Sequence, residues 1–251
     1  MTPLSFPALS FPSVIGHRGA AAHAPENTLA GFRTAAALGV RWVEFDARVT
    51  VDGVAVLCHD QRPIRTLGLA RAIERTRWAD LARRDAGRWF GPAFAGEPVP
   101  TLAETLALLA GLDLFPNIEV KQGSAGAARL IEAVGAAIAL AWPDGAPPPL
   151  LSSFDPPALR QAKRRLPGLP RGLNRETLAG DWRGQAEELG CVSVHVDHRA
   201  LTAPLALSVK SAGFALAAYT VDDPARAREL WSWGVDAIFS NAPDALLAAR
   251  R

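Results

Sequence analysis

The sequence is poor in cysteine and lacks any long hydrophobic run. Its 251 residues include two cysteines, one methionine and one tyrosine. Cys58 and Cys191 stand apart in apolar runs, without the close spacing of metal-binding cysteines, so we expect two reduced, buried thiols. No apolar run reaches the about 18 residues that a membrane-spanning helix needs. Residues 1–12 lack the basic and apolar regions of a secretion signal, and we expect a cytoplasmic protein without stable membrane insertion.

Charge of one sign is not in excess either. Lysine and arginine number 27 against 25 acidic residues, which leaves a net charge of +2. A nucleic-acid-binding protein usually carries a basic stripe, and none is evident, so nucleic acid is not an expected partner. With 49% hydrophobic and 21% charged residues, the chain can bury a sizeable core. No self-complementary patch is evident, so a monomer and a homodimer are both expected forms.

Short apolar runs alternate with longer stretches of helical period. Strands are expected at 13–16, 42–48, 54–58, 115–120, 150–153, 169–173, 191–196, 214–220 and 236–239. Helices are expected at 28–38, 125–141, 157–165, 182–189, 204–212 and 224–233. Repeated alternation of this kind predicts an α/β fold with a parallel sheet. The chain length suits a (β/α)8 TIM-type barrel.

Nine strand candidates are one too many for an eight-stranded barrel. Asp52-Gly53 is a hairpin signal just before 54–58, so that run is either the return arm of a hairpin or a barrel strand. Residues 61–100, rich in Arg, Gly and Trp, interrupt the alternation. This segment is too short to have a sizeable core of its own, so it is predicted to be an insertion over one mouth of the barrel. Residues 1–251 are then expected to form a single domain.

Polar residues that a core would exclude lie at the ends of four strand-like runs. They are His17, Arg18, Glu44, Asp46, His59, Glu119 and Lys121. In a β/α barrel the carboxyl ends of the strands converge on the face that carries the active site. The sequence therefore predicts that these side chains form one site.

Three of these residues are carboxylates suited to a metal ion. Glu44 and Asp46 are two residues apart on one strand, so their side chains point to the same side. Together with Glu119 they would repel one another strongly without a cation. Mg²⁺ and Ca²⁺ are hard cations that prefer such oxygen ligands, so a divalent metal is the expected cofactor.

The remaining four residues suit a phosphate diester. Arg18 and Lys121 can hold phosphoryl oxygens, and His17 and His59 can move protons at neutral pH. Taken singly, each has an ordinary structural interpretation, such as a hydrogen-bonded histidine or a surface lysine. Their shared position at one end of the strands favours a site.

Three other reactive side chains have structural interpretations. Cys58 points away from His59 on an extended strand, which favours core packing. His195 and His198 lie at the end of a later strand and could line the pocket, but satisfied structural histidines are the more common case.

The motifs around these residues resemble those of the glycerophosphodiester phosphodiesterase family. They read Ile15-Gly16-His17-Arg18-Gly19, Ala24-Pro25-Glu26-Asn27-Thr28, Val43-Glu44-Phe45-Asp46, Leu57-Cys58-His59-Asp60, Ile118-Glu119-Val120-Lys121 and Tyr219-Thr220-Val221. The similarity runs from residue 13 to about 245, with the motifs in the family's order. The runs 151–154 and 189–193 resemble the cytosolic bacterial members that accompany glycerol-3-phosphate uptake.

The resemblance implies a role for each candidate residue. Metal ligands would be Glu44, Asp46 and Glu119, the acid–base pair His17 and His59, and the phosphate contacts Arg18 and Lys121. Glu26 would support the site, while Asn27 would cap the first helix. The implied reaction is hydrolysis of a glycerophosphodiester to sn-glycerol 3-phosphate and an alcohol. Either water or the neighbouring glycerol hydroxyl could be the nucleophile.

Two other functions remain open at this point. A lysophospholipase D-type enzyme would cleave the same bond in lysophospholipids and needs an apolar entrance for an acyl chain. A non-catalytic phosphate-binding barrel would be expected to lack one of the histidines or carboxylates.

The sequence also departs from the family pattern at two places. Ser240-Asn241 stands where the family commonly has Thr-Asp, so a neutral side chain replaces an Asp that orients a pocket group, and the local hydrogen bonding, Arg18's included, is open. Leu67-Gly68-Leu69 differs from the family's usual lid sequence.

Overall fold

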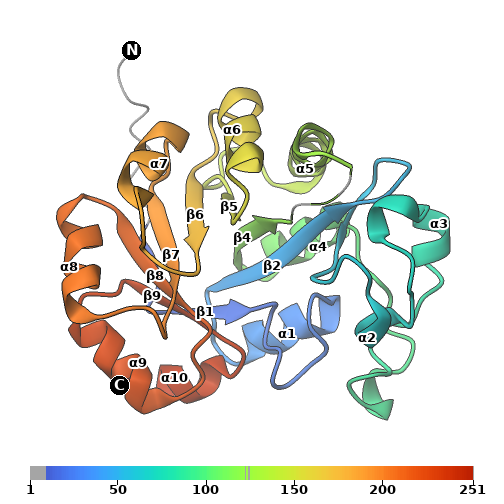
Figure 1. The fold of residues 1–251 in the computed structure, drawn as a ribbon. Coiled ribbons are helices and arrows are strands. Elements are labelled where there is room, and N and C mark those ends of the chain that lie inside the picture. The colour runs from blue at the N-terminus through green and yellow to red at the C-terminus, as the bar shows by residue number, and fades with distance from the viewer. Residues whose placement is uncertain (1–9, 122, 124, 251) are drawn as a thin grey trace.

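Eight parallel strands close into a barrel in the computed structural model, which describes residues 10–121, 123 and 125–250. The strands follow the order β1-β9-β8-β7-β6-β5-β4-β2, and β1 also pairs with β2, as Figure 1 shows. The barrel strands are β1 Val14–His17, β2 Trp42–Val49, β4 Phe115–Val120, β5 Leu150–Ser153, β6 Arg171–Arg175, β7 Ser193–Asp197, β8 Ala215–Tyr219 and β9 Ala237–Ser240. The predicted (β/α)8 barrel is therefore confirmed. The expectation of no secretion signal rests mainly on residues 1–9, which lie outside the described residues.

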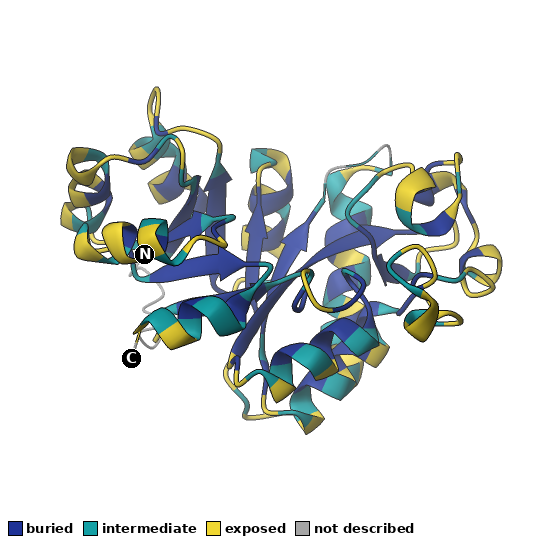
Figure 2. Ribbon diagram, turned by 90° about the horizontal axis from the view of Figure 1, so that it is seen from below, coloured by how far each residue is buried: buried dark blue, intermediate teal, exposed yellow. Residues whose placement is uncertain are grey.

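Helices surround the barrel and cover the strands. They are α1 Leu29–Ala37, α4 Leu102–Gly111, α5 Ala127–Ala141, α6 Pro156–Arg165, α7 Trp182–Leu189, α8 Ala203–Ser211, α9 Pro224–Ser232 and α10 Pro243–Arg250. Figure 2 shows buried strands inside and exposed residues on the outer sides of the helices. Across the described part of the chain, none of the helices has the length and apolar character needed to cross a bilayer.

The predicted helices omit α4 and α10. A start signal for α4 was present in the sequence, because Thr101 and Glu104 form a reciprocal capping box at its first turn.

The strand β3, Ala55–Leu57, is the return arm of a hairpin and not a barrel strand. It runs antiparallel to β2, with Ala47 opposite Leu57 and Val49 opposite Ala55. At the turn, the Val54 amide donates to Thr50 Oγ1 at 3.0 Å, and Gly53 adopts a φ of +88° that favours glycine. Of the two alternatives for 54–58, the return arm of a hairpin is therefore the correct one. Because β3 runs back along β2, His59 lies beside that strand.

The segment between β3 and α4 packs on this hairpin. It contains four short helices, α2 Ile64–Leu67, η1 Ile73–Arg75, α3 Trp78–Leu81 and η2 Pro92–Phe94, and it lies beyond the end of β2 at the right of Figure 1. A small apolar cluster joins it to the hairpin through Val56, Cys58, Leu67, Ile73, Leu81, Ala86 and Val99. Cys58 and Cys191 are both buried and free, as expected.

A buried ion pair also ties this segment to the barrel. Arg48 Nη1 of β2 donates to Glu74 Oε1 of η1 at 2.9 Å, and both side chains are buried. The Arg48 guanidinium donates to the His59 carbonyl as well, from Nε at 3.0 Å and from Nη2 at 2.7 Å. One arginine therefore fixes the inserted segment and the backbone of His59 to the same strand.

Removing Glu74 should destabilise the protein. We expect Glu74→Ala to lower the free energy of unfolding by about 3 kcal/mol, because Arg48 would keep a buried charge with less compensation. Glu187→Ala is a matched control, since it breaks the exposed pair with Arg183 and should change stability by less than about 0.5 kcal/mol. Urea unfolding of both variants tests this, and equal midpoints would contradict it.

Candidate active site

Strand register brings the predicted carboxylates together. Within the barrel, His17 of β1 lies opposite Glu44 of β2, and Asp46 of β2 lies opposite Glu119 of β4. Alternation along β2 directs Glu44 and Asp46 to the same side. Glu44, Asp46 and Glu119 each offer an oxygen within 4.8 Å of the other two, and all three are buried. Two neighbouring strands, β2 and β4, therefore build one acidic cluster.

The donor set of this cluster fits a hard divalent cation. Glu44 Oε1 is buried and has no hydrogen-bond partner among the described residues. Burial, together with the charges of Asp46 and Glu119, raises the pKa of Glu44 well above its usual value. Burial and the Asp46 charge also raise the pKa of Glu119. A bound Mg²⁺ or Ca²⁺ would remove this repulsion and satisfy the free oxygen.

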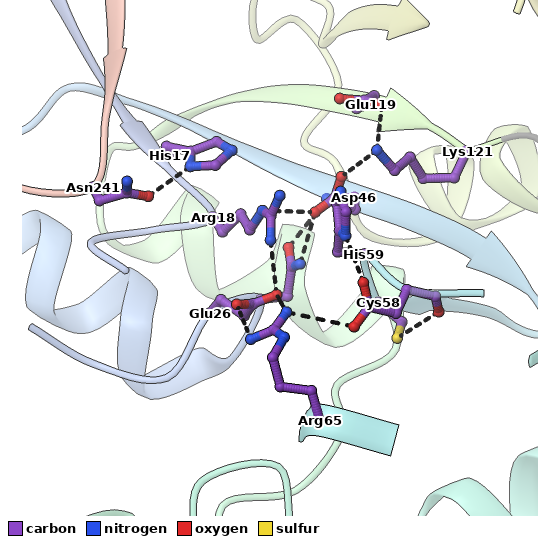
Figure 3. A network of polar contacts seen from close by, with 12 residues as sticks. His17, Arg18, Glu26, Asp46, Cys58, His59, Arg65, Glu119, Lys121 and Asn241 are labelled. Carbon is purple, nitrogen blue, oxygen red and sulfur yellow. Dashed lines mark hydrogen bonds and ion pairs between the residues drawn. The ribbon is translucent and has the colours of Figure 1, made fainter. Parts of the chain in front are cut away.

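Asp46 has the densest set of partners in the site, as Figure 3 shows. Lys121 Nζ lies 3.2 Å from Oδ1, and Arg18 Nε lies 3.3 Å from Oδ2. Burial alone would raise the pKa of Asp46, but the Lys121 and Arg18 cations outweigh it and hold that pKa below its usual range. Lys121 also donates to Glu119 Oε1 at 2.7 Å. Both predicted phosphate contacts therefore lie beside the carboxylates.

Asn27 contacts Asp46, so its predicted role as a helix cap is wrong. Its Nδ2 donates to Asp46 Oδ2 at 2.8 Å, and its Oδ1 accepts from the Asp46 amide at 3.1 Å. The cap of α1 is Thr28, whose Oγ1 accepts from the Gly31 amide at 3.1 Å. Asn27 has a φ of +57°, a left-handed conformation that asparagine tolerates better than most residues. This conformation turns the side chain toward β2.

Glu26 holds two arginines at the edge of the site. Arg18 Nη1 donates to Glu26 Oε1 at 2.9 Å, and Arg65 of α2 donates to both oxygens of Glu26 at 2.7 and 2.8 Å. The site residue Arg65 was not among the predicted candidates. It comes from the inserted segment, which was predicted to cover one mouth of the barrel, but no local sequence signal indicated which of its side chains would reach the site.

His17 lies at the end of β1 between an amide and a carboxylate. Its Nδ1 is 2.7 Å from Asn241 Oδ1, and its Nε2 is 3.8 Å from Glu44 Oε2. Burial and then the Arg18 cation lower the pKa of His17 to about 4. Asn241 thus contacts His17, while Arg18 is held by Glu26 and Asp46.

His59 follows β3 and has a carboxylate partner of its own. Its Nδ1 lies 2.8 Å from Asp60 Oδ1, and its carbonyl accepts from Arg48. Burial is the main cause of a lowered His59 pKa, against the raising effect of Asp46. Figure 3 shows His59 beside Asp46. The hairpin thus brings the second histidine to the acidic cluster.

A recess opens beside the carboxylates within the barrel. It has a volume of about 300 Å³, part of it open to solvent, and is lined by His17, Glu44, Asn117, Glu119, Ser152, Phe154, Asn174, His195, Tyr219 and Phe239. His195 is buried and lies 2.9 Å from Ser193 Oγ, as expected of a structural histidine, although it also lines the recess. The amide atoms of Asn117 have no hydrogen-bond partner among the described residues. The recess therefore offers polar groups to a small ligand.

The chain matches a known family model over most of its length. Residues 17–245 match the model described as the glycerophosphoryl diester phosphodiesterase family. A glycerophosphodiester phosphodiesterase of Caldanaerobacter subterraneus subsp. tengcongensis is 32% identical, and the match covers 93% of this chain and 96% of the relative. One of Bacillus subtilis is 27% identical, with 92% and 83% covered.

A solved structure is similar over nearly the whole chain. It is the Oleispira antarctica phosphodiesterase in complex with the product sn-glycerol-3-phosphate. It superposes with a TM-score of 0.92 at 33% identity and covers 96% of this chain and 97% of that chain.

Proposed function

The chain belongs to the glycerophosphoryl diester phosphodiesterase family, and we propose that it hydrolyses glycerophosphodiesters to sn-glycerol 3-phosphate and an alcohol. One observation carries this proposal most directly. Three buried carboxylates, two histidines and two cations meet at one end of the barrel strands. The sn-glycerol-3-phosphate bound to the Oleispira antarctica enzyme supports the same product class.

Glu44, Asp46 and Glu119 would hold the divalent metal. When bound, Mg²⁺ or Ca²⁺ supplies positive charge next to the phosphoryl oxygens as negative charge develops on them. Arg18 and Lys121 already lie against Asp46, so their charged ends are next to the carboxylates that would hold the metal. These two side chains would orient the diester and add hydrogen bonds to its oxygens.

The two histidines would divide the proton transfers. We assign His17 as the general base, which takes the proton from the nucleophile at Nε2. His59 then acts as the general acid and protonates the leaving alcohol, supported by Asp60 at its Nδ1. The nucleophile is water or the neighbouring glycerol hydroxyl, and the second route passes through a cyclic phosphate.

The recess favours a small, hydroxylated substrate over a lysophospholipid. Asn117, Ser152 and Asn174 place polar groups on its wall, suited to the hydroxyls of glycerol. Phe154 lines the recess and is exposed, but an apolar entrance long enough for an acyl chain would also need the aromatic residues of the insertion. Those rings pack on one another, with Trp89–Phe90 centroids 5.7 Å apart and Phe90–Phe94 centroids 5.4 Å apart.

The non-catalytic alternative has no support. It requires the loss of a histidine or a carboxylate, and all five are in place in the described site.

Parallel assays of two substrates test the proposed function. With Mg²⁺ or Ca²⁺ present, we expect kcat/KM on glycerophosphocholine to exceed that on lysophosphatidylcholine by at least about tenfold, because the recess suits glycerol and not an acyl chain. Release of sn-glycerol 3-phosphate and choline would be measured, with the His17→Ala variant as the background control. Faster turnover of the lysophospholipid would favour the lysophospholipase D alternative.

We also place the reaction in the cytoplasm, carried out by one barrel domain as a monomer or homodimer.

A further inference from the structure

A chain of hydrogen bonds runs from the surface of the barrel to His17. Asp222 follows β8 and precedes α9, and its Oδ2 accepts from Asn241 Nδ2 at 2.9 Å. Asn241 follows β9, and its Oδ1 lies 2.7 Å from His17 Nδ1. The loops after β8 and β9 therefore connect to the end of β1 through the hydrogen-bonded series Asp222–Asn241–His17.

The outer end of this chain is held firmly. Asp222 Oδ1 accepts from Ser240 Oγ at 2.8 Å, from the Asn241 amide at 2.7 Å and from the Ala242 amide at 3.2 Å. Burial raises the pKa of Asp222, but the bonds from Asn241, Ser240 and Ala242 outweigh it and lower that pKa. Asp222 is thus an ionised carboxylate that can only accept hydrogen bonds.

The direction of each bond follows from this fixed end. Because Asp222 can only accept, Asn241 must turn its NH₂ group outward and its carbonyl oxygen toward His17. That oxygen is also an acceptor only, so the proton of a neutral His17 must lie on Nδ1. We propose that Asp222 is a positioning residue that, through Asn241, fixes the His17 tautomer with the free lone pair on Nε2.

This tautomer is the one that the proposed reaction needs, and the inference rests on that function. His17 Nε2 faces Glu44 Oε2 at 3.8 Å, on the side of the acidic cluster. With its lone pair there, His17 can accept a proton from the nucleophile. With the proton there instead, the same ring could not act as a base.

The most direct test changes one atom type. In Asp222→Asn, the amide oxygen can keep the backbone donors, and its NH₂ group then faces Asn241. Asn241 should rotate, present its NH₂ group to His17 Nδ1 and move the histidine proton to Nε2. We expect kcat to fall by about 10- to 100-fold, the range for a lost outer partner, with little change in KM.

The double variant Asp222→Asn/Asn241→Asp should restore the original order. The carboxylate then stands next to His17 and accepts from Nδ1 directly, while the amide at 222 donates to it. We expect kcat to recover to within about threefold of the unmodified protein. A merely structural role for Asp222 would not produce this recovery.

Nitrogen-15 NMR of the His17 imidazole identifies its tautomer independently of enzymatic activity. His17 is assigned by comparison with His17→Ala, and the metal-free protein can be used. We expect the Nδ1–H form in the unmodified protein and in the double variant, and the Nε2–H form in Asp222→Asn. Asp244→Asn is the matched control, because Asp244 Oδ1 lies 2.7 Å from Nε2 of the exposed His23, and its kcat should not change.

Distinct outcomes separate this inference from the proposed function. An Nε2–H tautomer in the unmodified protein would overturn it, as would an unchanged tautomer in Asp222→Asn. If Asp222→Asn does not fold, Asn241→Ala provides the same test, since it removes the acceptor at Nδ1 and should lower kcat equally. Inversion of the tautomer with full kcat would support the positioning chain and contradict the base role of His17.

Discussion

Replacing Glu44 with Gln, or Asp46 with Asn, is expected to lower hydrolysis by about 10³-fold. Each change removes one anionic ligand from a hard-cation site, and a loss of about 4 kcal/mol of charge stabilisation corresponds to that factor. The measurement is the initial rate on glycerophosphocholine with saturating Mg²⁺ or Ca²⁺. Excess EDTA should abolish the activity of the unmodified protein, and full activity in EDTA would contradict the metal hypothesis.

The two variants should differ in stability, which separates metal loss from misfolding. Asp46 has Lys121, Arg18 and Asn27 as partners, so Asp46→Asn should lower the melting temperature of the metal-free protein. Glu44 Oε1 has no hydrogen-bond partner among the described residues, so Glu44→Gln should leave the melting temperature of the metal-free protein unchanged. Both should lose most of the upward shift in melting temperature that the metal produces. Glu187→Gln, at an exposed position, is the control. It should keep both the activity and the rise in melting temperature that the metal produces.

Much of the fold could be predicted because its signals are local. Alternating apolar runs and helical stretches indicated the barrel, and strand ends indicated where polar residues would gather. The hairpin remained ambiguous, since Ala55–Leu57 has the composition of a buried barrel strand and only its pairing with β2 distinguishes it. The strand expected at 169–173 begins later, at Arg171. Pro170 has no amide hydrogen to donate to the ladder, which favours that later start.

Contacts between segments that are distant in the sequence could not be predicted. Asn27 and Thr28 are both residue types that favour the N-cap position. Which of them caps the helix depends on Asp46, 19 residues away, because Asn27 donates its side-chain amide to that carboxylate. The contact between His17 and Asn241 spans 224 residues. Arg65 reaches Glu26 only because its short helix packs beside the hairpin. Residue types at strand ends thus indicated the carboxylates and histidines, whereas the partners that orient them depend on tertiary structure.

The acid–base roles give the second large expected effect. His17→Ala and His59→Ala should each reduce turnover of glycerophosphocholine by roughly 10²- to 10⁴-fold, the range for a lost proton-transfer group. Both variants should remain folded, because both side chains are partly exposed and neither fills a large apolar space. Circular dichroism and thermal melting would check this. Near-normal rates in both variants would contradict the two-histidine mechanism.

A substrate with a good leaving group assigns the two roles. The departing oxygen of a nitrophenyl phosphodiester needs little protonation, so this substrate should rescue the variant that has lost the general acid. We expect His59→Ala to be rescued and His17→Ala not, because activation of the nucleophile is needed for either substrate. The rescue is measured as the ratio of kcat/KM on the nitrophenyl diester to that on glycerophosphocholine, relative to the unmodified protein. Rescue of His17→Ala instead would exchange the roles while leaving both histidines in the site. His17 would then have to donate a proton from Nε2, and the tautomer that Asp222 and Asn241 favour, with a lone pair on Nε2, would be the wrong one for the reaction.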